Sequence, residues 1–366
     1  MHISPQRILI IKLSSLGDIV HTLPAVSALR QQFPFAQFTW LVKTTWASIL
    51  EGNADIDEVL SSDFSWNRWP HLIRTLRNKH FDLIVDFHGL LRSSLLGRLT
   101  GARMRVGFAQ AREGASWLYT HRVRLADQQA STWRLLDIHA VDRNLGIAQF
   151  LGAKINRPMF PLPRFAEDDT YIERFLQNAD VGCQEQLIAL APWSRSPLKS
   201  WPLDRFIELA QTLMRLPGVR VVVVGGPSEK SFSNEFRTLE SQGLINLVGQ
   251  LSLRQIPVLL RRMRLVVGND SSLIHLAAGV HVPVLAIFGP TNPRATGPYP
   301  LEAHSVLHAE LPCRPCGKRT CANPKYLECL HSLMVSSVIE EIQKIIHVGT
   351  KTREETCVLP GHPSRN

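Results

Sequence analysis

Short apolar runs alternate with amphipathic stretches along most of the chain, and this alternation predicts repeated strand–helix units. Residues 7–13 form an apolar run, and Ile19, Leu23, Val26 and Leu29 then recur at the spacing of one helix face. Repeated strand–helix units favour parallel sheets covered by helices on both faces. In the first half, the strands are expected at residues 7–13, 37–43, 56–60, 81–86 and 104–108, and the helices at 18–32, from 44 onward, 67–80, 90–99 and 132–151.

The same alternation restarts after residues 156–164, a segment that contains three prolines and is typical of a linker. The sequence therefore predicts two Rossmann-like domains that face each other, residues 1–165 and 166–348. The last helix could pack back on the first domain, and residues 349–366 would be a mobile tail. In the second half, the strands are expected at residues 187–191, 219–224, 245–248, 265–267 and 284–288, and the helices at 203–216, 228–239, 253–263, 271–280 and 335–348.

The length and the apolar content fit this organisation. The chain has 366 residues, of which 45% are hydrophobic, enough for packed cores. Its first 16 residues hold one short apolar run, residues 8–11, which reads as a buried strand and not as a signal peptide. No run approaches the roughly 18 apolar residues of a membrane span. A cytoplasmic protein is therefore expected.

Positive charge is concentrated in the first half. The formal net charge is +10, and residues 1–165 hold 20 Lys and Arg against 12 Asp and Glu. Such an excess favours an anionic partner, either nucleic acid, a phosphorylated substrate or a membrane surface, or it is a solvated basic face. Nucleic acid is not expected, because no aromatic–basic stacking pattern and no helix-turn-helix signature accompanies the charge.

Four of the six cysteines form a cluster with the spacing C-x2-C-x4-C-x7-C near the C-terminus, at Cys313, Cys316, Cys321 and Cys329. Four thiolates could hold a structural zinc ion, but the spacing is not that of a standard zinc ribbon. Reduced thiols that pack a loop are the favoured alternative. No metal ion and no cofactor is therefore expected, and the sequence contains neither a G-x-G-x-x-G nor a Walker A motif.

The strongest candidate for ligand binding is the strand-to-helix junction Asp270-Ser271-Ser272. Free backbone N–H groups and the positive end of the helix dipole point outward at such a junction, so a phosphate or diphosphate is the expected guest. An ordinary helix cap is the alternative, since Asp and Ser are favoured there in any protein. His275, on the following helix, is expected to pack or to bond the backbone.

Three further residues lie at the same expected rim of the second domain. Lys199 follows the first strand of that domain and could neutralise a diphosphate, with Ser194 as a hydroxyl donor. Glu229, after a Gly-Gly pair, could bond ribose hydroxyls or merely favour a helix N-terminus.

The loop after the first strand repeats this arrangement in the first domain. It carries Ser15, Gly17 and Asp18, and it should face the cleft between the domains. A carboxylate there could accept the proton of a substrate hydroxyl, or Asp18 could only cap its helix.

In order and spacing, several sequence blocks resemble the bacterial ADP-heptose heptosyltransferases, glycosyltransferase family 9. The resemblance extends from about Arg7 to Val348. The blocks are residues 12–25 (KLSSLGDIVHTLPA), 86–93 (DFHGLLRS), 111–113 (ARE), 199–202 (KSWP), 268–271 (GNDS), 275–278 (HLAA) and 288–293 (FGPTNP), and the cysteine loop also occurs in members of the family. One departure is Ser272, where the family commonly has Gly.

This resemblance implies a GT-B fold and a metal-independent, inverting transfer from ADP-L-glycero-D-manno-heptose. By motif position it implies Asp18 as general base. It also implies Ser194, Lys199, Glu229, Asp270, Ser271, Ser272 and His275 at the donor, and Ser15, Gly17, Arg68 and Arg112 at the acceptor.

The ARE block resembles the heptosyltransferase I branch, which implies Kdo2-lipid A as acceptor. The enzyme would associate peripherally with the anionic cytoplasmic face of the inner membrane. A later core acceptor, as for heptosyltransferase II, and a catalytically silent ADP-sugar or anionic-glycan binding protein remain alternatives.

Overall fold

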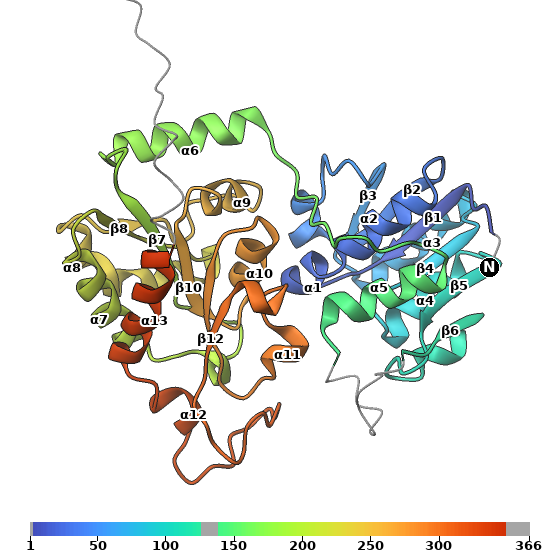
Figure 1. The fold of residues 1–366 in the computed structure, drawn as a ribbon. Helices are drawn as coiled ribbons and strands as arrows, with labels where there is room; N and C mark the ends of the chain where they lie inside the picture. The colour runs from blue at the N-terminus through green and yellow to red at the C-terminus, as the bar shows by residue number, and fades with distance from the viewer. Residues whose placement is uncertain (1–2, 126–137, 349–366) are drawn as a thin grey trace, which may run out of the picture.

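The computed structural model describes residues 3–125 and 138–348, which form two α/β domains side by side (Figure 1). The first domain is built on a six-stranded parallel sheet. Its strands are β1 (Arg7–Ile11), β2 (Gln37–Lys43), β3 (Glu58–Ser62), β4 (Leu83–Asp86), β5 (Met104–Phe108) and β6 (His121–Val123). The second sheet is also six-stranded and parallel. It comprises β7 (Gln186–Ala191), β8 (Val219–Val223), β9 (Ile245–Asn246), β10 (Leu265–Asn269), β11 (Val284–Ile287) and β12 (Ser305–Leu307).

The two sheets have the same strand order. It is β3-β2-β1-β4-β5-β6 in the first domain and β9-β8-β7-β10-β11-β12 in the second. In each sheet the order reverses direction between the first and the fourth strand, that is between β1 and β4 and between β7 and β10. Ligands of open α/β sheets bind beyond the carboxyl ends of the strands at such a switch point. The topology therefore places one candidate half-site in each domain.

Helices cover both sheets, and the two-domain Rossmann-like architecture expected from the sequence is confirmed. The helices of the first domain are α1 (Leu16–Val20), α2 (Leu23–Gln32), α3 (Trp69–Asn78), α4 (Leu91–Leu99) and α5 (Ala140–Phe150), with 3-10 turns η1 (Thr44–Ile49), η2 (Trp66–Arg68) and η3 (Ala115–Leu118). Those of the second are α6 (Ala166–Asn178), α7 (Leu203–Met214), α8 (Arg237–Glu240), α9 (Gln255–Leu260), α10 (Ser272–Gly279), α11 (Pro293–Thr296), α12 (Glu328–His331) and α13 (Val335–Val348), with 3-10 turns η4 (Pro197–Lys199), η5 (Pro227–Phe236) and η6 (Leu301–Ala303).

The central strands of both sheets are buried on both faces. Ile8, Leu9, Ile10 and Ile11 of β1 are fully buried, and Leu265 and Val267 of β10 likewise. Such continuous apolar runs are what a parallel sheet covered by helices requires. The polar side chains that follow these strands are therefore held at the end of a rigid layer.

Several expected elements differ from the structure. The single helix expected over residues 18–32 is two helices, because Pro24 cannot donate to the carbonyl of residue 20 and instead occupies the first turn of α2. Strands β6 and β12 and helix α6 were not expected. The last helix, α13, packs against α7 of the second domain and not back on the first domain. The expected tail, residues 349–366, and the start of the helix expected over 132–151 lie outside the described residues.

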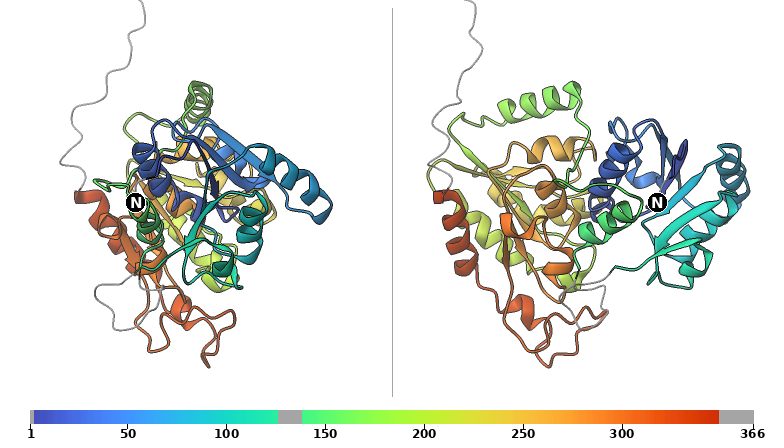
Figure 2. Two further views of the ribbon diagram at one scale, coloured as in Figure 1. Left: turned by 90° about the vertical axis from the view of Figure 1, so that its right-hand side faces the viewer. Right: turned by 45° about the vertical axis from the view of Figure 1, so that its right-hand side comes forward.

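The domains meet where α1 packs against α10 (Figure 2). The connecting segment that runs through residues 153–165 is also fixed to both domains. Asn53 of the first domain donates to the carbonyl of Pro161 at 2.5 Å. Phe165 packs against Gly52, and the Arg254 guanidinium of the second domain lies 4.1 Å from the Phe165 ring centroid.

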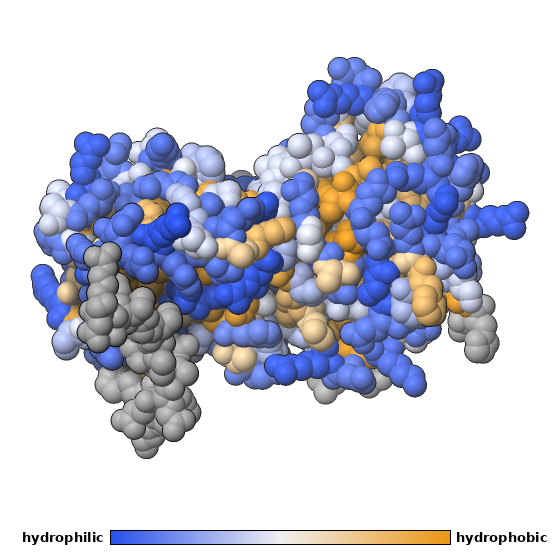
Figure 3. All heavy atoms as spheres, turned by 90° about the horizontal axis from the view of Figure 1, so that it is seen from above, coloured by the Kyte–Doolittle hydropathy of each residue, from blue (hydrophilic) through white to orange (hydrophobic). Residues whose placement is uncertain are grey.

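A space-filling view shows the two lobes with an indentation between them (Figure 3). Within residues 3–125 and 138–348, no helix is long and apolar enough to span a bilayer.

Candidate functional site

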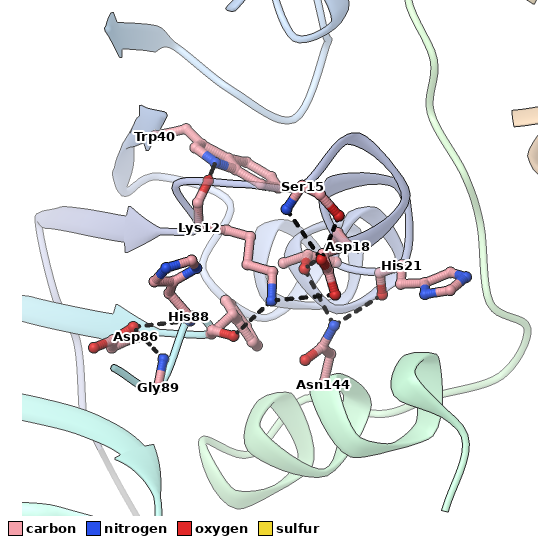
Figure 4. A network of polar contacts seen from close by, with 11 residues as sticks. Lys12, Ser15, Asp18, His21, Trp40, Asp86, His88, Gly89 and Asn144 are labelled. Carbon is pink, nitrogen blue, oxygen red and sulfur yellow. Dashed lines mark hydrogen bonds and ion pairs between the residues drawn. The ribbon is translucent and has the colours of Figure 1, made fainter. Parts of the chain in front are cut away.

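The switch point of the first sheet carries the carboxylate of Asp18 (Figure 4). Asp18 lies in the first turn of α1, directly after β1, and 48% of its side chain is exposed. Its Oδ2 accepts the backbone N–H of Ser15 at 3.0 Å and the Ser15 hydroxyl at 2.6 Å. Its Oδ1 lies 3.9 Å from Nζ of Lys12. One oxygen is therefore anchored, and the other stays accessible.

The surroundings of Asp18 favour its ionised form. Burial by itself would raise the pKa of the Asp18 carboxyl, but the Lys12 ammonium and the Ser15 hydrogen bonds outweigh it. The pKa therefore lies below its ordinary value. At neutral pH the side chain is a carboxylate and can accept a proton.

The loop after β4 forms the other side of this switch point, and a buried carboxylate shapes it. Asp86 accepts the backbone N–H groups of His88 and Gly89 at 2.8 and 3.1 Å, the Ser93 hydroxyl at 2.8 Å and the Tyr119 hydroxyl at 2.7 Å. Burial raises the pKa of Asp86, and the hydrogen bonds from Tyr119 and Ser93 oppose this. Asp86 has no exposed surface, so it fixes the loop and does not face a substrate.

Cationic side chains gather around Asp18. Lys12, Arg112 and Arg143 are close enough to act on one another electrostatically, and Arg143 also acts on Asp18. His88 lies in the same field, where burial and the Lys12 ammonium lower its pKa to about 4. This group of positive charges can therefore attract anionic groups of a substrate next to the Asp18 carboxylate.

At the switch point of the second sheet, Asp270 is the centre of a compact polar cluster. Its Oδ2 accepts Lys199 Nζ at 2.6 Å and the Thr291 hydroxyl at 2.7 Å, and its backbone carbonyl accepts the Ser194 hydroxyl at 3.2 Å. Asp270 is 5% exposed, whereas 32% of the Lys199 side chain is exposed. Lys199 therefore presents part of its ammonium at the rim, oriented by a buried carboxylate.

Helix α10 begins beside this ion pair. Ser271 is its N-cap, yet its side chain makes no capping hydrogen bond. The Ser271 hydroxyl oxygen is buried and has no hydrogen-bond partner among the described residues. Ser272, the residue that departs from the family's glycine, is the first residue of α10 and is half-buried. A helix N-terminus with a free hydroxyl and a neighbouring ammonium can bind a phosphate group.

Glu229 lies farther along the same rim, in η5. Its Oε1 accepts the Ser228 hydroxyl at 2.7 Å. Its Oε2 is folded over Gly226, where a Cβ would lie 2.9 Å from it. Glu229 thus follows the carboxyl end of β8, which is the neighbour of β7, the strand before Lys199, and lies two strands from β10, the strand before Asp270.

His275 connects the two half-sites. Its Nε2 lies 4.0 Å from Asp270 Oδ1, and a Cβ on Gly17 would lie 2.7 Å from its Cδ2. Its ring also meets that of His21 edge to face, with centroids 4.3 Å apart. Burial lowers the pKa of His275 to about 4, against the opposing Asp270 carboxylate, so this ring is neutral at pH 7. His275 and Gly17, expected at the donor and the acceptor, are therefore packed in the domain interface.

The remaining acceptor candidates differ in their position. The Ser15 hydroxyl is used to hold Asp18. Arg112 is exposed and joins the cationic group around Lys12. Arg68 lies after β3 at the edge of the sheet, where it is exposed and lies 3.6 Å from Asp63. The structure therefore brings together every candidate except Arg68 and Glu229, which extend the same rims outward.

The four clustered cysteines line one cavity of about 400 Å³ with Leu198 and Pro290. Cys313 and Cys316 are exposed, Cys321 is half-buried and Cys329 is buried. In the part of the chain that the structure describes, no group of three or more His, Cys, Asp or Glu side chains is placed to hold a metal ion. The zinc alternative thus has no geometric support. Arg314 and Gly317 of this loop bond the carbonyls of Gly289 and Pro290, which precede Thr291 at the donor rim.

The sequence reasoning missed several residues of the site. Lys12 follows β1 and begins the block of residues 12–25, so its position in the sequence could have identified it as a site residue. Arg143 lies on α5 and His139 directly precedes it, and only the tertiary fold brings these two residues near α1. Asn144 of α5 donates to the carbonyl of His21 at 3.0 Å and thereby fixes α5 beside α1.

Comparison with known proteins gives consistent matches. The family model "Glycosyltransferase family 9 (heptosyltransferase)" matches residues 69–327. Lipopolysaccharide heptosyltransferase 1 of Pseudomonas aeruginosa is 32% identical over 342 residues, which cover 86% of this chain and 87% of that protein.

Two solved structures extend the similarity. Escherichia coli heptosyltransferase WaaC with ADP-2-deoxy-2-fluoro heptose is 26% identical, with a TM-score of 0.66 over 92% of this chain and 99% of that chain. E. coli ADP-heptose lipopolysaccharide heptosyltransferase II is 21% identical, with a TM-score of 0.74 over 94% and 99%. The latter likeness shows the fold, and the two facing Rossmann-like domains are those of the GT-B arrangement.

Proposed function

Because this chain belongs to glycosyltransferase family 9 and is a glycosyltransferase, we propose that it transfers L-glycero-D-manno-heptose from ADP-heptose to the Kdo2-lipid A inner core of lipopolysaccharide. The observation that carries the proposal is the pairing of the two switch points. A half-exposed, ionised Asp18 lies on one side of His275, and the Lys199–Asp270 pair with the N-terminus of α10 lies on the other.

In this reaction Asp18 is the general base. The acceptor hydroxyl oxygen attacks the anomeric carbon of the heptose, and its proton passes to the Asp18 carboxylate. The bond from the anomeric carbon to the diphosphate oxygen breaks on the opposite side, and its electron pair leaves with ADP. Attack opposite to the leaving group inverts the anomeric configuration.

The second domain stabilises the departing ADP. Negative charge grows on the diphosphate as the bond breaks, and donors that are already in place stabilise it best. Lys199, the Ser271 hydroxyl and the N-terminus of α10 are such donors, and Glu229, farther along the rim after β8, would bond the ribose hydroxyls. These groups supply the positive potential that a bound cation provides in other transferases, so we propose a metal-independent transfer.

The cationic group around Asp18 suits the acceptor. Kdo2-lipid A carries carboxylates and phosphates, and Lys12, Arg112 and Arg143 supply positive charge near the carboxylate that would take the proton of its attacking hydroxyl. Arg68 extends the charge along the rim. The basic excess of residues 1–165 also supports peripheral association with the anionic cytoplasmic face of the inner membrane.

The first heptose position is supported by the ARE block and by the name of the P. aeruginosa relative. The second candidate is a later core acceptor. It is favoured by the sequence likeness to lipopolysaccharide heptosyltransferase 3 of Escherichia coli, which is 27% identical over 296 residues.

Transfer can be tested with purified protein, ADP-heptose and either Kdo2-lipid A or its monoheptosylated form. We expect a mass gain of one heptose on Kdo2-lipid A, unchanged by a chelator. A gain only on the monoheptosylated lipid would assign the later position. ADP binding without transfer to either lipid would overturn the enzyme proposal in favour of a binding protein.

The role of Asp18 is tested in the same assay by Asp18→Asn. We expect kcat to fall by about 100-fold or more because the proton acceptor is lost, while affinity for ADP stays near that of the wild type. Asp204→Asn, an exposed carboxylate on α7, is the matched control and should retain full activity. Full activity of Asp18→Asn would remove Asp18 as the base.

A further inference from the structure

Lys12 is a buried cation at the end of β1. Only 11% of its side chain is exposed, and Nζ donates to the carbonyl of Phe87 at 3.0 Å. A buried ammonium is costly unless an anion compensates it. The two carboxylates that act on it are Asp18 and Asp86. Asp86 already accepts four hydrogen bonds, so Asp18 is the carboxylate whose negative charge is available to compensate the Lys12 ammonium.

The Lys12–Asp18 contact has an uncommon geometry for an ion pair. At 3.9 Å, Nζ is too far from Asp18 Oδ1 for a hydrogen bond, but it is close enough for strong electrostatic attraction. The hydrogen bonds to Asp18 come instead from Ser15, and both go to Oδ2. The ammonium therefore stabilises the charge of the carboxylate without occupying the lone pairs of Oδ1.

We infer that Lys12 is a positioning residue for the transfer, whose ammonium keeps the Asp18 carboxylate ionised and leaves Oδ1 free for the proton of the acceptor hydroxyl. This inference rests on the proposed role of Asp18 as base. The proton moves from the acceptor oxygen to Oδ1 as that oxygen bonds to the anomeric carbon and ADP departs. Lys12 keeps its own protons throughout.

The other charged groups near Asp18 keep one charge state over the pH range of the test, which starts at about pH 5. His88 on the β4–α4 loop and His275 on α10 each have a pKa of about 4, so both are neutral from about pH 5 upward. Arg143 on α5 is charged throughout. Above about pH 5 both rings are neutral and wild-type Asp18 is ionised, so a loss of activity that a Lys12 variant shows there as the pH falls reports the Asp18 carboxyl.

Lys12→Met removes the charge but keeps an unbranched side chain of similar length. We expect the acid limb of the kcat/KM profile to move to higher pH, so that the loss of activity grows as the pH falls. Lys12→Gln, which can still donate to the Phe87 carbonyl, should show the same shift. Lys43→Met is the matched control, because Lys43 is an exposed lysine at the end of the neighbouring strand β2. Its profile should keep the wild-type limb.

A loss of equal size at every pH would overturn the inference, since a structural defect acts in that way. A shift in Lys12→Met but not in Lys12→Gln would also overturn it and assign Lys12 to the Phe87 hydrogen bond alone.

The titration of the Asp18 carboxyl by 13C NMR, without substrate, supplies a second readout. A titration at higher pH in Lys12→Met supports the inference, and an unchanged one refutes it. This measurement still decides the matter if the wild type transfers no heptose, a result that would count against the proposed function instead.

Discussion

Acidification should weaken the domain interface through His275. The His275 side chain is buried beside Gly17 and His21, and its pKa of about 4 lies well below the ordinary value of 6.5. Between these two values the unfolded chain binds a proton at this residue and the folded chain does not. The free energy of unfolding therefore falls as the pH decreases through this window, and it is unaffected by His275 above it.

The size of this effect follows from the two pKa values. A difference of roughly 2.5 units corresponds to about 3 kcal/mol when fully developed. From about pH 7 to about pH 5, His275 lowers the free energy of unfolding by about 2 kcal/mol. At pH 5 this histidine is protonated in most of the unfolded chains but in few of the folded ones. His21 and His139, whose pKa values burial also lowers, act in the same direction.

Chemical denaturation followed by tryptophan fluorescence at these two pH values measures the effect. The wild type should lose about 2 kcal/mol more of its free energy of unfolding than His275→Gln does. His71→Gln, an exposed histidine on α3, should lose as much as the wild type. Equal losses in the wild type and His275→Gln would refute the reasoning, because the other histidines are present in both proteins.

Two further substitutions test the frame around each half-site. Tyr119→Phe removes one of the hydrogen bonds to buried Asp86, so we expect the free energy of unfolding to fall by about 1.5–3 kcal/mol in denaturant titrations. Tyr171→Phe, at an exposed tyrosine on α6, is the control, and an equal loss in both variants would contradict the expectation. Lys199→Met removes the ammonium from the donor rim, so the Kd for ADP measured by calorimetry should rise by about tenfold or more. Lys230→Met, at an exposed lysine in η5, should bind ADP as the wild type does. Equal affinities of all three proteins would exclude Lys199 from the diphosphate site.

The apolar pattern was enough to predict both sheets, because central parallel strands are apolar throughout. Edge strands β6 and β12 have three residues each, and their burial is partial, so they leave little periodic signal. Helix α6 was missed because it follows the proline-rich segment directly and its exposed face is strongly charged. The split of residues 18–32 into α1 and α2 was signalled by Pro24, whose effect on the backbone outweighs the helical spacing of the apolar residues.

The candidate site could be predicted as far as strand ends reveal it. Asp18, Lys199 and Asp270 each follow a strand, so the sequence places them at a sheet edge. The interface role of His275 and Gly17 and the proximity of Arg143 depend on how two domains and α5 pack, and no local pattern encodes that. The functional roles of these residues stay predictions.

The chain between the domains is held by both of them near its C-terminal end, where Pro161 and Phe165 meet Asn53 and Gly52 of the first domain and Phe165 also meets Arg254 of the second. A swing of one domain against the other would therefore pivot near Phe165 instead of stretching a loose tether. Lengthening the chain at this pivot would leave each domain intact and still change the angle at which nucleophile and leaving group meet.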